Sequence, residues 1–387
     1  MGKRSTLIYL IAGEPSGDAI GARLMKALSE ISDQPIKYEG IGGDAMIANG
    51  LNSLFPITEL SVMGFLEVVP HARRILKRIN EVAKDIIRKR PDIVITIDSP
   101  SFSIRVAKRI ANLNIPKVHY VAPTVWAWRP WRVNKFQRYY DHLLTILPFE
   151  PPYFECKNLV TTFVGHPVLE YGEGISNGSN FRIRYGISES DTLICLLPGS
   201  RRNEVIRHLG IFGDTLDILS GKKKRYLSTI PTLPHLVDLV YESTANWQQK
   251  PHIIETPKEK YEAMAASNVA LAASGTVALE TIIANLPTVV AYRVNPVTAF
   301  MVRRLIKVDF VNIVNIMAKR EIIPECLQEN CQPEKLRDEL NRLIKGEGPE
   351  QIRAAAPFIK ALRSGNEMPS RVAAKYLIEF VLVKLWE

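Results

Sequence analysis

Residues 7–18 read Leu-Ile-Tyr-Leu-Ile-Ala-Gly-Glu-Pro-Ser-Gly-Asp, an apolar run that ends in a glycine-rich turn. The run Leu7–Ala12 predicts a buried strand, and the pattern from about Gly17 to Ile31 predicts a helix. Further runs of the same two kinds follow in the first half of the chain: Ile93–Ile97, Ile104–Leu113 and Val118–Val121. Because strands alternate with helices, we expect an α/β fold with a doubly wound parallel sheet.

A second series of strand patterns begins after residue 190. Its members are Leu193–Leu197, which ends in Pro198-Gly199-Ser200, Val269–Ala273, which ends in Ser274-Gly275-Thr276, and Thr288–Tyr292. Between the two series, residues 172–180 are rich in Gly, Ser, Asn and Glu, which is typical of a linker. We therefore predict two Rossmann-like domains facing a cleft, residues 1–170 and 181–360. The last helical pattern, Arg371–Trp386, is long and apolar enough to pack across another domain.

The composition is that of an ordinary globular protein. The chain has 387 residues, of which 46% are hydrophobic, and no apolar run approaches the roughly 18 residues that span a bilayer. The start shows no signal peptide, so we expect a cytoplasmic protein. The four cysteines lack zinc-like spacing, so we expect reduced thiols, no metal and no cofactor. A net charge of +10 indicates an anionic partner, which could be nucleic acid, a membrane face or a phosphorylated substrate.

A basic stretch lies beside an apolar patch in the first domain. Residues 71–90 contain eight Lys or Arg and two acids. An apolar patch next to basic residues is typical of proteins that bind to a membrane surface. The residues that we assign to membrane docking are Val62, Met63, Phe65, Leu66, Val69, Arg73 and Arg74. The alternative is a buried helix whose basic face is solvated.

Two polar motifs follow predicted strands of the first domain. The Gly13 turn opens a helix, where backbone N–H groups favour anions, although a plain capped turn fits equally well. Asp98 ends the run Ile93–Ile97, a position where α/β folds place site residues, and it is our candidate general base. Its alternative role is that of a helix N-cap.

Two similar motifs follow strands of the second domain. Gly199, Ser200 and Arg201 offer helix N–H groups and a guanidinium to a diphosphate. The motif Ser274-Gly275-Thr276 lies one helical turn before Glu280, so Thr276 and Glu280 share a helix face. Together the two motifs suit phosphates and a ribose diol, whereas either alone could be a helix cap.

Residues 125–132 alternate three tryptophans with arginines, in the order Val-Trp-Ala-Trp-Arg-Pro-Trp-Arg. Such a segment could stack bases, grip a sugar or face a lipid interface. The sequence has no RNA- or DNA-binding signature to support the first of these.

At these motifs the sequence resembles the lipid-A-disaccharide synthase family. The resemblance covers nearly the whole chain, and its ordered motifs are Ala-Gly-Glu-x-Ser-Gly-Asp at 12–18, Ile41-Gly42-Gly43, Val62-Met63-Gly64 with Glu67, Ile97-Asp98, His119-Tyr120-Val121, Trp126-Ala127-Trp128-Arg129, Leu147-Pro148-Phe149-Glu150, Phe163 to Pro167, Leu197 to Arg201, Ala273 to Thr276, Asn315 and Arg320-Glu321. The chain departs from the family at Pro15 and at Ser101-Phe102-Ser103, where the family usually has an alanine, and an acid and an amide around the phenylalanine.

The resemblance implies a GT-B glycosyltransferase with an acceptor-side first domain, a nucleotide-side second domain and a helix at 366–387 that returns to the first. It implies transfer of 2,3-diacylglucosamine from UDP to 2,3-diacylglucosamine 1-phosphate, with inversion, to give a β-1,6-linked disaccharide 1-phosphate. We then expect Asp98 as the base and Glu14, Ser16 and Asn315 along the sugar and phosphate region. The partners would be these two substrates and the cytoplasmic face of an inner membrane, with a homodimer and without nucleic acid.

Two alternatives remain at this point. Another GT-B enzyme, such as a UDP-N-acetylglucosamine 2-epimerase or a lipid II transferase, would share the nucleotide half. A basic nucleic-acid-binding protein would explain the charge but not the anion motifs at two strand ends.

Overall fold

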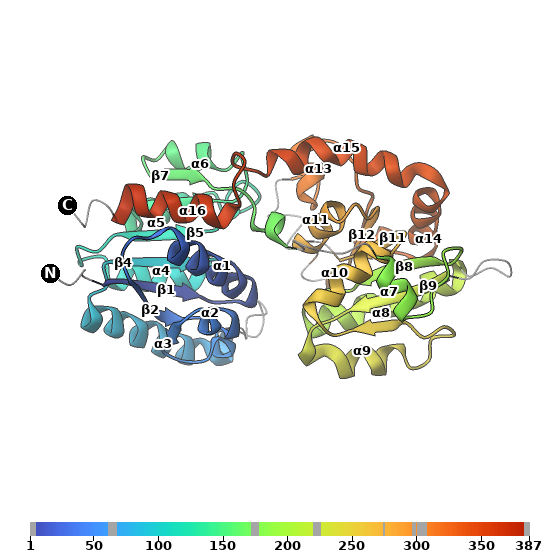
Figure 1. Ribbon diagram of the computed structural model, residues 1–387, viewed down its shortest axis with the longest axis horizontal. Coiled ribbons are helices and arrows are strands. Elements are labelled where there is room, and N and C mark those ends of the chain that lie inside the picture. Colours follow the sequence, from blue (N-terminus) through green and yellow to red (C-terminus); the bar gives the residue numbers. More distant parts are fainter. Residues whose placement is uncertain are drawn as a thin grey trace. The chain divides into compact units, whose positions relative to one another are not determined.

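The computed structural model describes residues 5–60, 68–171, 178–219, 226–273, 275–295, 299 and 308–382. The chain forms two compact units. Unit 1 consists of Met1–Pro167 and Leu362–Glu387, and unit 2 consists of Val168–Ala361. Each unit contains a parallel β-sheet with helices on its two faces (Figure 1).

Unit 1 is built on a sheet with the strand order β3-β2-β1-β4-β5-β6-β7. Its strands are β1 (Thr6–Ala12), β2 (Ile36–Ile41), β3 (Leu51–Ser53), β4 (Ile93–Ile97), β5 (Lys117–Tyr120), β6 (His142–Thr145) and β7 (Val160–Phe163). Its helices are α1 (Pro15–Ile31), α2 (Asp44–Ala48), α3 (Val68–Lys89), α4 (Pro100–Arg109), α5 (Arg132–Tyr139), α6 (Pro151–Glu155) and α16 (Pro369–Leu377).

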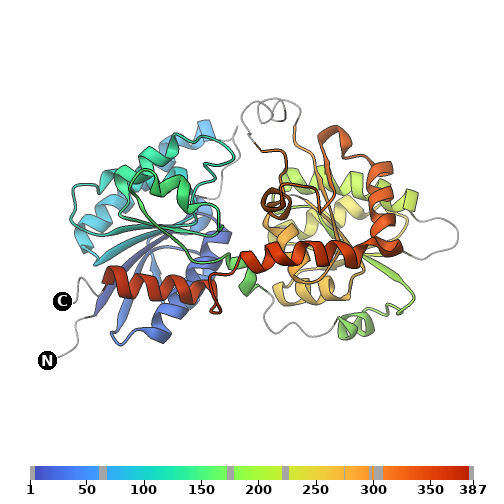
Figure 2. The ribbon, with the colours of Figure 1, turned by 90° about the horizontal axis from the view of Figure 1, so that it is seen from above.

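The apolar run of β1 serves both faces of this sheet, because successive side chains of a strand point to opposite sides. Ile8 and Leu10 pack in one buried cluster with α1 and α16. Tyr9 and Ile11 pack in another with α3 and α4. Although it lies at the end of the sequence, α16 therefore completes the first of these layers and lies along α1 (Figure 2).

Unit 2 repeats the pattern, with the strand order β10-β9-β8-β11-β12-β13. Its strands are β8 (Thr192–Leu197), β9 (Tyr226–Pro231), β10 (His252–Ile254), β11 (Val269–Ala272), β12 (Thr288–Tyr292) and β13 (Glu325–Leu327). Its helices are α7 (Ser179–Arg184), α8 (Arg202–Leu219), α9 (Val237–Thr244), α10 (Pro257–Ala266), α11 (Thr276–Ile283), α13 (Ile313–Ala318), α14 (Pro333–Arg342) and α15 (Gly348–Ala361).

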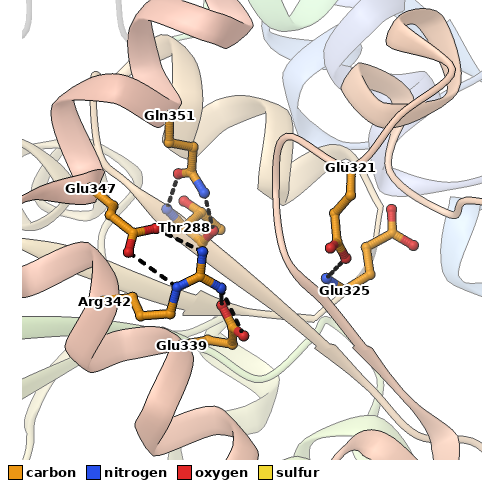
Figure 3. A network of polar contacts seen from close by, with 7 residues as sticks. All are labelled: Thr288, Glu321, Glu325, Glu339, Arg342, Glu347 and Gln351. Carbon is orange, nitrogen blue, oxygen red and sulfur yellow. Dashed lines mark hydrogen bonds and ion pairs between the residues drawn. The ribbon is translucent and has the colours of Figure 1, made fainter.

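Side-chain contacts hold α15 to the sheet of unit 2 and α14 to the segment that precedes α15. Gln351 of α15 pairs with both backbone groups of Thr288, accepting from its N–H at 2.7 Å and donating to its carbonyl at 3.0 Å (Figure 3). Arg342 of α14 forms ion pairs with Glu339 at 2.9 Å and with Glu347 at 2.7 Å. The pair of hydrogen bonds with Thr288 is buried. It satisfies backbone groups that would otherwise be buried without a partner, at a cost in folding free energy.

The described helices differ from the predicted ones at both ends, and α4 ends at Arg109 where the pattern predicts Leu113. Helices α1 and α4 begin at Pro15 and Pro100 rather than at 17 and 104, because proline suits the first position of a helix. Helix α7 begins at Ser179, inside the predicted linker, and residues 172–177 of that linker lie outside the described residues.

Candidate active site

Both sheets reverse their strand order at one place. In unit 1 the reversal lies between β1 and β4, where Ala12 is the register partner of Ile97. In unit 2 it lies between β8 and β11, where Leu197 is the register partner of Ala272. Ligands of open α/β sheets bind beyond the carboxyl ends of the strands at such a switch point. The polar motifs found in the sequence follow these four strands.

The turns after β1 and β4 are packed against each other. A Cβ added to Gly13 would lie 2.4 Å from Ser99 Oγ, and a Cβ added to Gly17 would lie 3.3 Å from the Ile97 carbonyl oxygen. A side chain at position 13 would therefore force the two turns apart. The glycine at this position permits the close approach of its backbone to the Ser99 side chain.

Asp98 is held by four hydrogen bonds at the end of β4. Its carboxylate accepts from Ser16 Oγ at 3.3 Å and from the Ser99 N–H at 2.7 Å. Its backbone N–H donates to the Tyr120 carbonyl at 2.9 Å, and its carbonyl accepts from Ser103 Oγ at 2.9 Å. Ser101 and Ser103 thus stand in the first turn of α4, and Ser103 supports the backbone of Asp98. Position 16 and position 98 are brought into contact across 82 residues.

The backbone at Asp98 is strained. Its φ is 54° and that of Ser99 is 44°, both in the left-handed region. A non-glycine residue there costs on the order of 1 kcal/mol, and such residues cluster at functional sites. Burial raises the pKa of the Asp98 carboxyl above its ordinary value, and the hydrogen bonds from Ser99 and Ser16 act in the opposite sense. A carboxylate with a raised pKa is a better proton acceptor.

The other acids of the first turn have different surroundings. Glu14 is the N-cap residue of α1 and is half-buried. Asp18 is buried and accepts hydrogen bonds from the N–H groups of Gly43 at 2.8 Å, Ala45 at 3.1 Å and Met46 at 3.0 Å. Asp18 therefore caps α2 from α1, which is a structural role within the motif at 12–18.

In unit 2, the turn after β8 brings Gly199 close to Glu204 of α8. The φ of Gly199 is 118°, and a Cβ added there would lie 2.7 Å from Glu204 Oε2. Glu204 Oε1 lies 3.2 Å from Arg201 Nη1 and accepts a hydrogen bond from Tyr292 Oη at 3.3 Å. Arg201 is exposed over 64% of its side chain, and Ser200 beside it is exposed. This turn thus presents a guanidinium to solvent.

His208 of α8 joins the ends of two strands behind this turn. Its Nε2 accepts from the Arg293 N–H at 3.1 Å, so the ring proton is on Nδ1, which donates to the Pro198 carbonyl at 2.7 Å. Burial lowers the pKa of His208, which keeps the ring neutral. The sequence motif did not include His208, because its partners are backbone groups of distant strands.

The turn after β11 begins α11. Gly275 is the N-cap residue with a φ of 121°, Thr276 is the first residue of the helix, and Ser274 lies outside the described residues. Glu280, one turn on, is buried and its Oε2 accepts from Lys260 Nζ at 2.5 Å and from Tyr261 Oη at 3.0 Å. Sequence reasoning missed these two residues of α10, since nothing in their own pattern marks them.

Asn315 is completely buried. Its Oδ1 accepts from the N–H groups of Ile322 at 2.8 Å and Ile323 at 3.0 Å, and its Nδ2 donates to the Ile323 carbonyl at 2.8 Å and to Glu325 Oε1 at 2.9 Å. Glu325 also accepts from backbone groups at 311 and 312, and Figure 3 shows its own N–H bonded to Glu321. These contacts fix the segment around α13, and a contact of Asn315 with the sugar stays a prediction.

The residues predicted to dock on a membrane are described only in part. Val62, Met63, Phe65 and Leu66 lie outside the described residues, and of Val69 only its place in α3 is described. Arg73 and Arg74 are exposed on α3, whose opposite face is buried through Ile75, Ile79, Val82, Ala83 and Ile86. In the described parts of the chain, no helix is long and apolar enough to cross a bilayer, and no three His, Cys, Asp or Glu side chains are grouped as metal ligands would be.

The family model and the known proteins that this chain matches carry the same description. Residues 8–376 match the family model described as lipid-A-disaccharide synthetase. A lipid-A-disaccharide synthase of Rhodospirillum centenum is 44% identical over 379 residues, covering 97% of this chain and 94% of that protein. One of Paramagnetospirillum magneticum is 43% identical over 381 residues, covering 97% of each.

Solved structures with the same fold are more distant in sequence. A UDP-GlcNAc 2-epimerase from Neisseria meningitidis bound to UDP-GlcNAc has a TM-score of 0.63 at 13% identity, covering 98% of this chain and 100% of that chain. The calicheamicin glycosyltransferase CalG4 has a TM-score of 0.60 at 15% identity, covering 99% and 100%. At such identities the likeness concerns the fold alone, and it confirms the predicted α/β GT-B architecture.

Proposed function

The chain belongs to the lipid-A-disaccharide synthetase family, and from this premise we propose how its residues carry out the transfer. The enzyme is a glycosyltransferase that joins UDP-2,3-diacylglucosamine to 2,3-diacylglucosamine 1-phosphate. The products are the β-1,6-linked disaccharide 1-phosphate and UDP. Since an α-linked donor gives a β-linked product, the acceptor 6-hydroxyl attacks the anomeric carbon directly, opposite to the departing UDP.

Asp98 acts as the general base in this proposal. The observation that carries it is the placement of one carboxylate at the switch point of unit 1, bonded by Ser16 and held in a strained turn. As the 6-oxygen forms its bond to the anomeric carbon, its proton passes to Asp98 Oδ. General-base catalysis of this kind contributes about 10²- to 10⁴-fold in rate.

Unit 2 binds the UDP part of the donor in the same proposal. The leaving diphosphate gains negative charge as its bond to the sugar breaks, so a cation placed beside it stabilises the transition state more than the ground state. Arg201 is suited to this because its guanidinium is exposed at the switch point. The helix N-termini at Gly199 and Ser200 and at Gly275 and Thr276 add backbone N–H groups, and Glu280 accepts hydrogen bonds from the ribose. The predicted part of Ser274 in this site lies outside the described residues.

Unit 1 also provides the docking surface for a membrane, since both substrates carry acyl chains. Arg73 and Arg74 are exposed on α3, next to the predicted apolar patch at 62–69. We place the enzyme on the cytoplasmic face of an inner membrane on this ground. Homodimerisation stays a prediction.

Turnover of four variants tests the two assignments together. We expect Asp98→Asn to lower kcat by about 10²- to 10⁴-fold and Arg201→Ala to lower it by about 10²- to 10³-fold, with UDP binding weakened only in the second. Asp33→Asn, in the turn after α1, and Arg353→Ala, exposed on α15, are the matched controls and should keep wild-type turnover. Full activity in either test variant would remove the corresponding role.

A further inference from the structure

The segment after β5 runs beside Asp98. Strand β5 pairs with β4, with Tyr120 as the register partner of Ile97, and the Asp98 N–H donates to the Tyr120 carbonyl at 2.9 Å. Residues 121–131 then connect β5 to α5. The first residue of α5, Arg132, donates from Nη2 to Ser101 Oγ at 3.3 Å. Since Ser101 stands three residues after Asp98, this contact joins the end of the segment to the first turn of α4, the helix that follows Asp98.

The guanidinium groups of Arg129 and Arg132 both lie close to the Trp128 ring. The Arg129 guanidinium lies 4.1 Å from the centroid of the Trp128 ring, and that of Arg132 lies 5.2 Å from the same centroid. Both arginines are half-buried, and burial together with the charge of Arg129 lowers the pKa of Arg132. Residues 101–140 contain eight Lys or Arg and no acid. Holding two like charges together in a half-buried place costs free energy, which an anionic ligand would offset.

The segment is held in place from behind. Trp126 Nε1 donates to the buried Glu150 at 3.2 Å, and the Trp126 ring meets Phe149 edge to face with centroids 5.2 Å apart. Arg129 has a φ of 53°, a left-handed conformation that a non-glycine residue keeps only when its surroundings impose it. The backbone that carries Arg129 is thus held in place before any ligand arrives, which reduces the entropy lost on binding.

We propose that Arg129 and Arg132 bind the phosphate monoester of the acceptor sugar. This inference rests on the proposed function, in which the acceptor 6-hydroxyl faces Asp98. The phosphate on C1 and the hydroxyl on C6 are at opposite ends of one pyranose ring, so a phosphate site is required about one ring away from the base. The Arg132 contact to Ser101 holds a cation against the first turn of α4, which begins directly after Asp98 and Ser99. Planar guanidinium groups match phosphate oxygens with two parallel hydrogen bonds.

The pair also explains how an acceptor without a phosphate is rejected. Such a sugar would take the two guanidinium groups out of water without offering them phosphate oxygens. Sites built for a polar group discriminate strongly against a ligand that lacks it, because their own groups are then unpaired. The two arginines therefore determine specificity for the acceptor and take no part in binding the donor.

The test compares two acceptors, 2,3-diacylglucosamine 1-phosphate and 2,3-diacylglucosamine, with the full-length enzyme. We expect Arg129→Gln and Arg132→Gln each to raise KM for the phosphorylated acceptor about 10- to 100-fold, with KM for the donor unchanged. The preference for the phosphorylated acceptor, as a ratio of kcat/KM values, should fall by the same factor. In Arg132→Lys, which keeps the charge, this preference should fall less. Arg138→Gln, exposed further along α5, is the matched control and should change neither value.

Two further arms separate this inference from its rivals. Asp98→Asn should lower kcat and leave the ratio of the KM values for the two acceptors unchanged. Failure of the base assignment is therefore distinguishable from failure of the phosphate assignment. Vesicles of phosphatidylglycerol and phosphatidylethanolamine should bind the wild type and the Arg129→Gln/Arg132→Gln double variant equally. An unchanged acceptor preference in the variants would overturn the proposal. Loss of vesicle binding in the double variant would also overturn it, and would assign the pair to lipid headgroups.

Discussion

At the scale of single residues, the surroundings of Asp98, the proposed base, act on its pKa in opposite directions. Burial raises its pKa, while the Ser16 hydroxyl and the Ser99 N–H stabilise the charged form and lower it. The balance between these effects sets the pH at which the base becomes active.

The acid side of the rate profile tests this balance. A base must be ionised, so kcat/KM should fall as pH drops through the pKa of Asp98, which lies above the ordinary value for aspartic acid. Ser16→Ala removes a donor to the carboxylate and should move this fall to higher pH. Asp98→Asn should abolish it along with most of the rate. If Ser16→Ala does not shift the pH profile, the fall in kcat/KM is due to the titration of another group.

Glu150 provides a second titration, visible in stability. Burial raises its pKa to about 7, against the hydrogen bonds that it accepts from Trp126 and from the N–H groups at 146 and 147. The folded protein therefore retains a proton that the unfolded chain has lost, and this contribution to stability is lost as pH rises from about 4.5 to about 7. The effect is on the order of 1 kcal/mol for each unit of pKa difference.

Urea unfolding of Glu150→Gln checks the titration. The variant should be less stable overall, because its amide group faces backbone N–H donors, by about 1 to 3 kcal/mol. Its free energy of unfolding should also vary less than that of the wild type between about pH 5 and about pH 7.5. Other titrating groups are common to both proteins and cancel in the comparison. Parallel curves for the two proteins would contradict a pKa near 7 for Glu150.

At the scale of elements, the contact of two strand-to-helix turns holds the Asp98 site together. Gly13→Ala would place a methyl group 2.4 Å from Ser99 Oγ. We expect a loss of about 1 to 3 kcal/mol in the free energy of unfolding, together with a lower kcat. Ser99→Gly removes the opposing side chain from a residue with a φ of 44°, where glycine is favoured.

The double variant Gly13→Ala/Ser99→Gly should therefore recover most of the lost stability, as denaturant unfolding can measure. Gly210→Ala, on the exposed side of α8, is the control, because a Cβ there meets nothing within 4 Å and neither Gly13 nor Gly210 has a positive φ. If the double variant is as unstable as the two single changes combined, the two turns are not in the contact described here.

The motifs at strand ends could be predicted from the sequence because a buried strand followed by a polar turn is a local pattern. The position of Asp98 after β4 and of Arg201 after β8 follows from that rule. The contact between Ser16 and Asp98 required the sheet order, which no local pattern contains. Lys260 and Tyr261 were missed because they reach Glu280 from another helix. Three-residue strands such as β10 and β13 are too short for a periodic signal.

At the scale of the whole molecule, the two units repeat one design. Each sheet places its first and fourth strands at the centre, and each therefore has a switch point with a polar turn on either side. The net charge of +10 fits a protein whose substrates are a nucleoside diphosphate sugar and a sugar phosphate, and it fits the proposed docking on an anionic surface.

The exposed arginines of α3 permit a test of membrane docking. Arg73→Ser/Arg74→Ser should weaken binding to anionic vesicles by about 1 kcal/mol for each charge removed, and the difference from wild type should shrink at high salt. Arg353→Ser/Lys360→Ser removes two exposed charges from α15 as a matched control. Sedimentation with vesicles measures both. Equal binding of the wild type and the α3 variant would show that the basic face of α3 is exposed to solvent and does not dock on the membrane.

The central claim is the transfer reaction itself, and release of UDP measures it most directly. Purified protein is given UDP-2,3-diacylglucosamine with and without detergent-dispersed 2,3-diacylglucosamine 1-phosphate, with EDTA throughout. We predict UDP release that depends on the acceptor, is unaffected by EDTA and is lost in Asp98→Asn. UDP binding without acceptor-dependent release would contradict the transfer reaction and leave only the fold in place.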